Sequence, residues 1–253
     1  MITVLLSFML TSCNFLNQNK PDAVIEIDLT KPGKIFHPDL YRVLNETLNR
    51  KAETINNPSK GNLKTALNLA TKMIAIENNV DSAKMISDTS AFLNLNELKT
   101  YQRSTVNNDK QSFYTPVYYA MKMFSDNKPD KLMPVKVSLN NGDSSVKGIS
   151  ATAGIHEKSG IVIIKMVNLF NTPIHCQIVL NYKQQIKYKG EVIVMTSGNI
   201  TNGNSLKEPE KVVPMTKDLN GLRNTFNYEC PANAFVIIHL RYKKGINGFV
   251  DCC

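Results

Sequence analysis

Apolar and polar residues alternate near the start of the chain and again, in short runs, through its second half. The stretch DAVIEIDL (22–29) places its apolar residues on one face and Glu26 and Asp28 on the other, which predicts a half-buried strand. From Leu132 onward, apolar runs recur between turn signals such as Lys158–Gly160. This spacing predicts an antiparallel β-sandwich. The predicted strands are MPVKVSL, VKGISATAGI, GIVIIKMVNL, PIHCQIVLNY, EVIVMT, NTFNYEC and AFVIIHLRY.

Two segments between these regions have the periodicity of helices. The run TPVYYAMKMFSDN predicts a helix that Thr115 caps and Pro116 begins. The run LYRVLNETLN (40–49) fits a strand and a helix equally well. The other predicted helix extends from Leu63 to Glu77, and its apolar stripe consists of Leu63, Ala66, Leu67, Ala70, Met73 and Ile74.

The polar loop GNSLKEPEKVVP (203–214) contains residues that restrict its conformation. Pro209 and Pro214 fix the backbone φ angle and remove two N–H donors, which predicts an extended, irregular segment. Val212 and Val213 offer side chains that can pack on an apolar surface. We therefore expect a long loop that lies over the β-domain.

The first residues have the length and character of an export signal. The apolar run Ile2–Leu10 is too short to span a bilayer and ends in LTSC, which resembles a bacterial lipobox with Cys13 as the acylated residue. No Lys or Arg precedes this run, so a plain signal peptide or a wrongly assigned start remains an alternative. The interpretation implies a protein anchored by lipid to the bacterial cell envelope, periplasmic or on the outer surface, with no other membrane contact.

The net charge of +9 is spread along the chain rather than gathered in a block. Its densest part, NYKQQIKYKG (181–190), interleaves Tyr182 and Tyr188 with three lysines. Such a pattern can bind nucleic acid, but lysines at an exposed strand edge also prevent aggregation. We favour the strand edge and expect no nucleic-acid partner.

The cysteines and histidines do not have the spacing of a metal site, and we expect neither a metal nor a cofactor. Cys176 and Cys230 could form a disulfide between two strands in an oxidising compartment, but buried free thiols are the favoured alternative.

Several segments, in matching order, resemble glycoside hydrolase family 51 α-L-arabinofuranosidases. The loop NSLKEPEKVVP is similar to an NSxxxPxxVxP loop near the end of that family, and IVIIKMVNLFNTP (161–173) is similar to part of its C-terminal sandwich. The resemblance extends over most of the chain, from Ala23 to Tyr242. Its other segments are AVIEIDLTKPGKIFHPDLYRVLNETLN, which resembles the family's opening, GNLKTALNLATKMIAIENNVDSAKMISDTSAFLNLN, which resembles a late barrel unit, and YTPVYYAMKMFSDNKPDKLMPV, which resembles the last barrel helix.

The resemblance implies a shortened barrel. A (β/α)₈ barrel typically needs about 250 residues. Here the first barrel strand, near Leu40 to Leu48, leads directly to the last units at Gly61, and the segment with the family's Asn-Glu acid/base pair is absent. The implied fold is α+β, a C-terminal antiparallel β-sandwich with a truncated (β/α) barrel remnant of a few helices. The implied regions are residues 1–21 (signal and tether), 22–30 with 126–253 (sandwich) and 31–125 (barrel remnant).

Retaining glycoside hydrolysis needs two carboxyl groups about 5–5.5 Å apart. The resemblance gives Glu46 the role of binding the arabinosyl residue, with a surface position on a helix as an equal alternative. Glu53 lies where the nucleophile strand would end, but the spacing is short and the family's flanking residues are missing. Glu77 and Asp81 are interpreted as a solvated helix face. The sequence thus assigns no catalytic residue, Glu46 to substrate binding and Cys13 to lipid attachment.

Three functions remain open. The first is an α-L-arabinofuranosidase that acts on arabinan or arabinoxylan without a metal or cofactor, although the missing acid/base glutamate puts its activity in question. The second is a non-catalytic surface lipoprotein that binds carbohydrate or a protein partner. The third is a gene remnant whose helices have uncovered apolar faces and therefore aggregate or oligomerise. The oligomeric state is not determined by the sequence.

Overall fold

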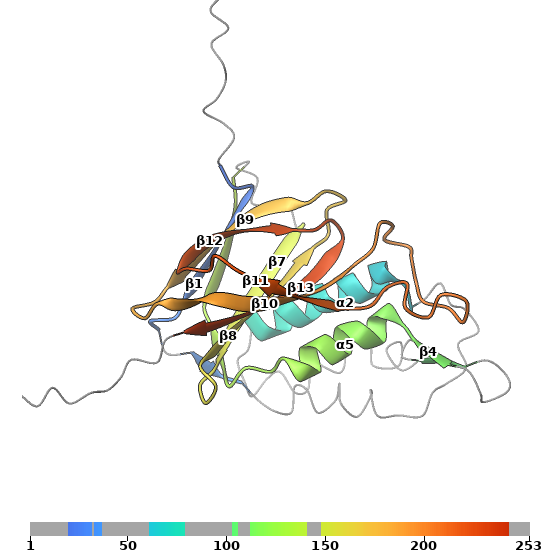
Figure 1. The fold of residues 1–253 in the computed structure, drawn as a ribbon, viewed down its shortest axis with the longest axis horizontal. Helices are drawn as coiled ribbons and strands as arrows, with labels where there is room; N and C mark the ends of the chain where they lie inside the picture. Colours follow the sequence, from blue (N-terminus) through green and yellow to red (C-terminus); the bar gives the residue numbers. More distant parts are fainter. Residues whose placement is uncertain are drawn as a thin grey trace, which may run out of the picture.

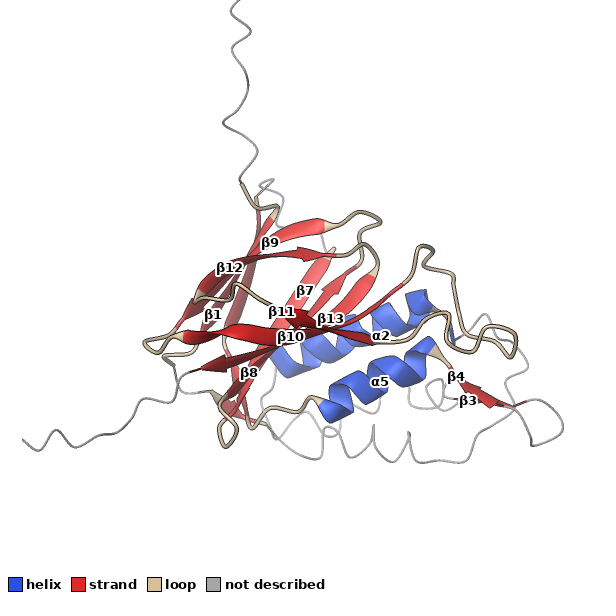
Figure 2. Cartoon of the chain, in the orientation of Figure 1, coloured by secondary structure: helices blue, strands red, loops and turns tan. Residues whose placement is uncertain are grey.

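Three layers make up the described part of the chain (Figure 1). The computed structural model describes residues 20–31, 33–36, 61–78, 103–105, 112–140 and 148–242. A four-stranded sheet packs on one face of a seven-stranded sheet, and two helices cover the other face (Figure 2).

The strand order within the two sheets is mostly non-sequential. Strand β1 lies between two partners, antiparallel to β6 and parallel to β9. The smaller sheet has the order β12 (Thr225–Cys230), β9 (Ile174–Asn181), β1 (Ala23–Asp28) and β6 (Val135–Leu139). The larger sheet has the order β11 (Met215–Leu219), β10 (Ile186–Thr196), β13 (Ala234–Tyr242), β8 (Ile161–Asn168), β7 (Ile149–His156), β5 (Lys131–Met133) and β2 (Lys34–Ile35). A separate hairpin pairs β3 (Arg103–Thr105) with β4 (Ser112–Tyr114).

Strand β8 is buried on both faces because it lies in the middle of the three layers. Val162 and Ile164 pack toward the smaller sheet, whereas Ile163 and Val167 pack toward the helices. Strand β13 alternates in the same way between the two cores. The nearly continuous apolar runs of these two strands therefore follow from burial on both sides.

The two helices bury their apolar faces on the larger sheet. Helix α2 (Leu63–Asn78) buries its whole predicted stripe, and helix α5 (Pro116–Asp126) begins where the sequence predicts, with Thr115 as its N-cap. The ring of Phe124 in α5 stacks on Phe235 of β13 with the centroids 4.9 Å apart. The hypothesis of uncovered helix faces is therefore wrong for these helices, because the sandwich itself covers them.

The α+β fold that the sequence predicts is confirmed, and the described residues contain no closed barrel. The sandwich departs from a purely antiparallel arrangement only at the pair β1–β9, among the described strands. Cys176 and Cys230 are buried free thiols, as the favoured alternative predicts. They lie on neighbouring strands but not opposite one another, since Cys176 faces Tyr228 and Cys230 faces Ile174. The boundaries of the regions stay a prediction.

Candidate functional site

The residues to which the sequence assigned a function are not placed by the structure. Cys13, Glu46 and the weaker candidate Glu53 lie outside the described residues, and so does Asp81. Their roles therefore stay predictions.

The loop 203–214 fastens the start of α5 to the sandwich, and we call its part Asn204–Val212 the clasp loop. The buried side-chain amide of Asn204 donates through Nδ2 to the carbonyl oxygens of Tyr114, at 2.8 Å, and Val212, at 3.0 Å. The N–H of Val212 donates to Asn204 Oδ1 at 2.7 Å. The side chain of Val212 is fully buried in the core that both helices share. Asn204 of the motif is thus explained by its hydrogen bonds to the backbone, and Val212 by the burial of its side chain in the shared core.

The residues just before the clasp loop cap helix α2. The carbonyl oxygens of Asn202 and Ile200 accept from the N–H groups of Leu63 and Lys64, each at 2.8 Å. These two donors belong to the first turn of α2, where no partner exists within the helix. One sandwich connection therefore positions the beginnings of both helices.

Three tyrosines form a cluster at the start of α5, next to the clasp loop. The rings of Tyr114 and Tyr118 stack with centroids 4.1 Å apart, and Tyr119 contacts both rings edge-on. Tyr114 remains 40% exposed. This tyrosine cluster was not predicted from the sequence, although the spacing of the tyrosines in YTPVYY, directly beside a capped helix start, was a usable signal.

Two tyrosines of the cluster, Tyr118 and Tyr119, have a raised pKa. Burial raises the pKa of Tyr118, with a further contribution from Tyr114, and burial also raises the pKa of Tyr119, with a further contribution from Glu210. A neutral phenol can donate and accept a hydrogen bond beside an apolar ring. This combination suits a ligand that has both C–H faces and hydroxyl groups.

Glu77 is not on a solvated face, contrary to the prediction from sequence. Its side chain is buried, and its Oε1 lies 2.6 Å from Nζ of Lys165 on β8, which is also buried. Burial lowers the pKa of Lys165, and the adjacent carboxylate opposes this shift. The ammonium also lies 4.8 Å from the ring centroid of Phe124. Glu77 is buried because it continues the apolar stripe of α2, so its charge needs a partner from the sheet.

This ion pair does not provide glycosidase chemistry. Glu77 is the only acidic side chain that is buried among the residues the structure describes. A nucleophile or general acid must reach the substrate, and a retaining enzyme needs a second carboxyl group rather than an ammonium beside the first. The pair between α2 and β8 is therefore structural.

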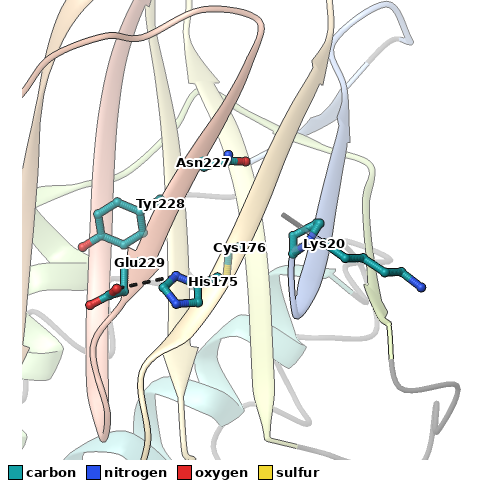
Figure 3. A pocket seen from close by; sticks show the side chains of 7 residues that line it. Lys20, His175, Cys176, Asn227, Tyr228 and Glu229 are labelled. Carbon is teal, nitrogen blue, oxygen red and sulfur yellow. Dashed lines mark ion pairs between the residues drawn. The ribbon is translucent and has the colours of Figure 1, made fainter. Parts of the chain in front are cut away.

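A hollow of about 330 Å³ lies on the smaller sheet, beside β9 and β12 (Figure 3). His175 Nδ1 lies 3.5 Å from Glu229 Oε2, and both side chains are mostly exposed. Cys176 lines the same hollow, but burial raises the pKa of its thiol to about 12. Because the thiolate is the nucleophilic form, this cysteine is inert at neutral pH. The hollow therefore lacks an activated nucleophile.

Within the described ranges, no group of three or more His, Cys, Asp or Glu side chains is arranged to hold a metal ion. The helices in those ranges are too short or too polar to cross a membrane.

Comparison with known proteins gives a consistent result. A family model described as the alpha-L-arabinofuranosidase C-terminal domain matches residues 41–234. Alpha-L-arabinofuranosidase 2 of Arabidopsis thaliana is 26% identical over 154 residues, which are 61% of this chain and 22% of that protein. Alpha-L-arabinofuranosidase 1 of the same plant is 26% identical over 178 residues, 69% of this chain and 26% of that protein. The chain thus spans about a quarter of the length of these relatives.

A solved structure has the same fold. The thermostable GH51 alpha-L-arabinofuranosidase from Thermotoga petrophila RKU-1 superposes with a TM-score of 0.56 at 17% sequence identity. The match covers 75% of this chain and 40% of that one. At this identity the likeness concerns the fold alone.

Proposed function

The chain belongs to the family of α-L-arabinofuranosidase C-terminal domains, and on this premise we propose that it binds arabinose-containing carbohydrate without cleaving it. The ligand class is the terminal arabinofuranosyl residues of arabinan or arabinoxylan. The observation that carries the proposal is the tyrosine cluster, an exposed aromatic surface that the clasp loop holds in place. The non-catalytic part rests on the structural role of the buried Glu77.

The tyrosine cluster has the properties of a sugar-binding surface. The exposed ring of Tyr114 is supported from behind by Tyr118, so that little side-chain freedom is lost when a sugar stacks on it. Its backbone is held through the carbonyl that accepts from Asn204. A ligand site gains affinity when it is ordered before binding.

Calorimetric titration of the purified chain with arabinotriose tests the proposal. We expect measurable heat for the unaltered chain and at least about a tenfold loss of affinity in Tyr114→Ala, as for loss of a stacking ring. Met215→Ala removes another exposed large apolar side chain, outside the tyrosine cluster, and serves as the control. No heat with the unaltered chain, or equal affinity in Tyr114→Ala, would contradict the proposal.

The second candidate is hydrolysis, and the observation that supports it is the name of the Arabidopsis relatives, which are α-L-arabinofuranosidases. Hydrolysis of an aryl α-L-arabinofuranoside by the chain, beside Glu46→Ala and Glu53→Ala, separates the two candidates. Turnover that disappears with either substitution would establish an active site and overturn the non-catalytic proposal. Absence of turnover, with arabinotriose still bound, supports it.

We also propose attachment to the bacterial envelope through a lipid on Cys13, on the basis of LTSC and the preceding apolar run. Expression of the whole chain in bacteria with labelled fatty acid should label it, and Cys13→Ser should abolish the label. A labelled Cys13→Ser variant would rule out this attachment point.

A further inference from the structure

A second cleft, of about 680 Å³, lies in the basic and aromatic stretch at the start of β10. Its apolar part is formed by the buried side chains of Ile186 and Leu222. Lys187, Tyr188 and Arg223 add charge and an aromatic ring, and Tyr188 is 61% exposed. This stretch, which the sequence predicts to be a solvated strand edge, thus lines a concave surface.

A β-bulge displaces these side chains from the regular sheet. Ile186 pairs with Tyr242 and Gly190 with Leu240, so four steps along β10 correspond to two steps along β13. The residues between Ile186 and Gly190 therefore leave the ladder. Bulges redirect side chains and are frequent beside functional sites. Here the bulge carries Lys187 and Tyr188 into the cleft.

The turn between β11 and β12 is fastened across the bulge at two points. The N–H of Leu222 donates to the carbonyl oxygen of Tyr188 at 3.0 Å, and the N–H of Ile186 donates to Asn224 Oδ1 at 3.1 Å. Arg223 lies between these two attachments. The amide of Asn224 is further fixed, because its Nδ2 donates to the carbonyl oxygens of residues 182 and 184, each at 3.0 Å.

The close approach of the two segments requires glycine at position 190. A Cβ at Gly190 would lie 2.3 Å from the carbonyl oxygen of His239 and 2.7 Å from Cδ1 of Leu222. Both distances are shorter than any ordinary carbon contact. The bulge, the fastened turn and this glycine together make a preformed site.

The charge of the cleft favours an anion. Lys187 and Arg223 line it, and no Asp or Glu is among its lining residues. A guanidinium pairs with a carboxylate through two parallel hydrogen bonds, while an exposed aromatic ring offers a flat apolar face. A ligand that satisfies both is a sugar that bears a carboxylate.

We infer that this cleft binds a uronic-acid residue of an acidic polysaccharide. The inference rests on the proposed carbohydrate-binding function and adds a second, anionic subsite to it. A single-stranded nucleic acid fits less well, because such sites stack successive bases on several rings. The other tyrosine of the stretch, Tyr182, packs edge-on against Tyr242 at 5.4 Å, which leaves Tyr188 as the exposed ring of the cleft.

Calorimetric titration with trigalacturonic acid at low ionic strength tests the inference. We expect binding that weakens with added salt. Tyr188→Ala and Arg223→Gln should each reduce the affinity by about tenfold or more. The affinity of Arg223→Lys should lie between those of the unaltered chain and Arg223→Gln, because lysine keeps the charge but lacks the paired donors of the guanidinium. Lys189→Gln is the matched control, since it removes the same charge from an exposed neighbour that does not line the cleft.

The outcomes separate this inference from the proposed function. Arg223→Gln should bind arabinotriose normally, and Tyr114→Ala should bind trigalacturonic acid normally. The uronate site would be overturned by absence of heat with trigalacturonic acid, or by a loss of affinity in Lys189→Gln equal to that in Arg223→Gln. Either result would leave the proposed arabinose site unaffected. Tighter binding of oligodeoxythymidylate than of trigalacturonic acid, lost in Tyr188→Ala, would assign the cleft to nucleic acid instead.

Discussion

The ion pair of Glu77 and Lys165 shows how one residue on an apolar face determines its partner. Both side chains are almost fully buried, so each charge would be very costly without the other. Removal of one partner therefore has a different effect from removal of both.

We predict that Lys165→Met lowers the free energy of unfolding by about 3 kcal/mol, because it leaves the carboxylate of Glu77 buried without its ammonium. The double replacement Glu77→Leu with Lys165→Met should recover most of this loss. Urea unfolding followed by circular dichroism measures both. Lys122→Met, which breaks an exposed pair with Asp126, is the control and should cost under about 0.5 kcal/mol. An equal cost for Lys165→Met and Lys122→Met would contradict the structural role.

The buried thiol of Cys176 should make stability depend on alkaline pH. Burial raises its pKa from the ordinary 9.0 to about 12, so the folded state holds the proton that the unfolded state releases. The stabilisation is complete below pH 9 and is lost as pH rises toward 12, by at most about 1.4 kcal/mol per pH unit. Urea midpoints measured at pH 8 and pH 10.5 should therefore fall less in Cys176→Ala than in the unaltered chain. Identical pH dependence in the two chains would contradict the raised pKa of this thiol.

Among the elements, the clasp loop connects sandwich and helices with few residues. Its key residue, Asn204, makes three hydrogen bonds to backbone groups while buried. We predict that Asn204→Ala lowers the free energy of unfolding by about 2 kcal/mol, because the buried groups lose their partner. The control Asn199→Ala affects an exposed turn in the same connection and should cost about 0.5 kcal/mol. Equal costs measured in urea would remove the special role of the clasp loop.

The periodicity of the sequence predicted where helices and strands form, but not which strands pair with one another. The stripe of α2 and the cap of α5 follow from local sequence, and so do the runs that became strands. Alternation along β1 indicates which face is buried but not that the strand lies between β6 and β9. The sites depend on such pairings, so the cleft at β10 could not be predicted from its residues alone.

The error at Glu77 has a specific cause. This residue continues the spacing of Met73 and Ile74, and Lys165 interrupts an otherwise apolar strand. Two polar residues within apolar runs were therefore a signal of a buried pair. The sequence does not show that the two runs meet, because 88 positions separate them.

At the scale of the whole molecule, the two cores meet in the middle sheet. Strands β8 and β13 contribute alternate side chains to the core under the helices and to the core between the sheets. The helices and the sandwich therefore should unfold together. A remnant with uncovered helices would instead aggregate or lose its helices first.

Phe124→Ala tests this cooperativity. The substitution removes the ring that stacks on Phe235, and we predict a loss of about 3–5 kcal/mol. If the molecule unfolds as one unit, the free energy of unfolding should decrease by the same amount in two measurements. These are urea unfolding followed by the helical circular dichroism signal, and hydrogen exchange of the β8 and β13 amides. Loss of the helices at lower urea, with β8 and β13 still protected, would show that they are a separable layer. A monodisperse unaltered chain with one transition would agree with the covered helix faces and would argue against the remnant hypothesis.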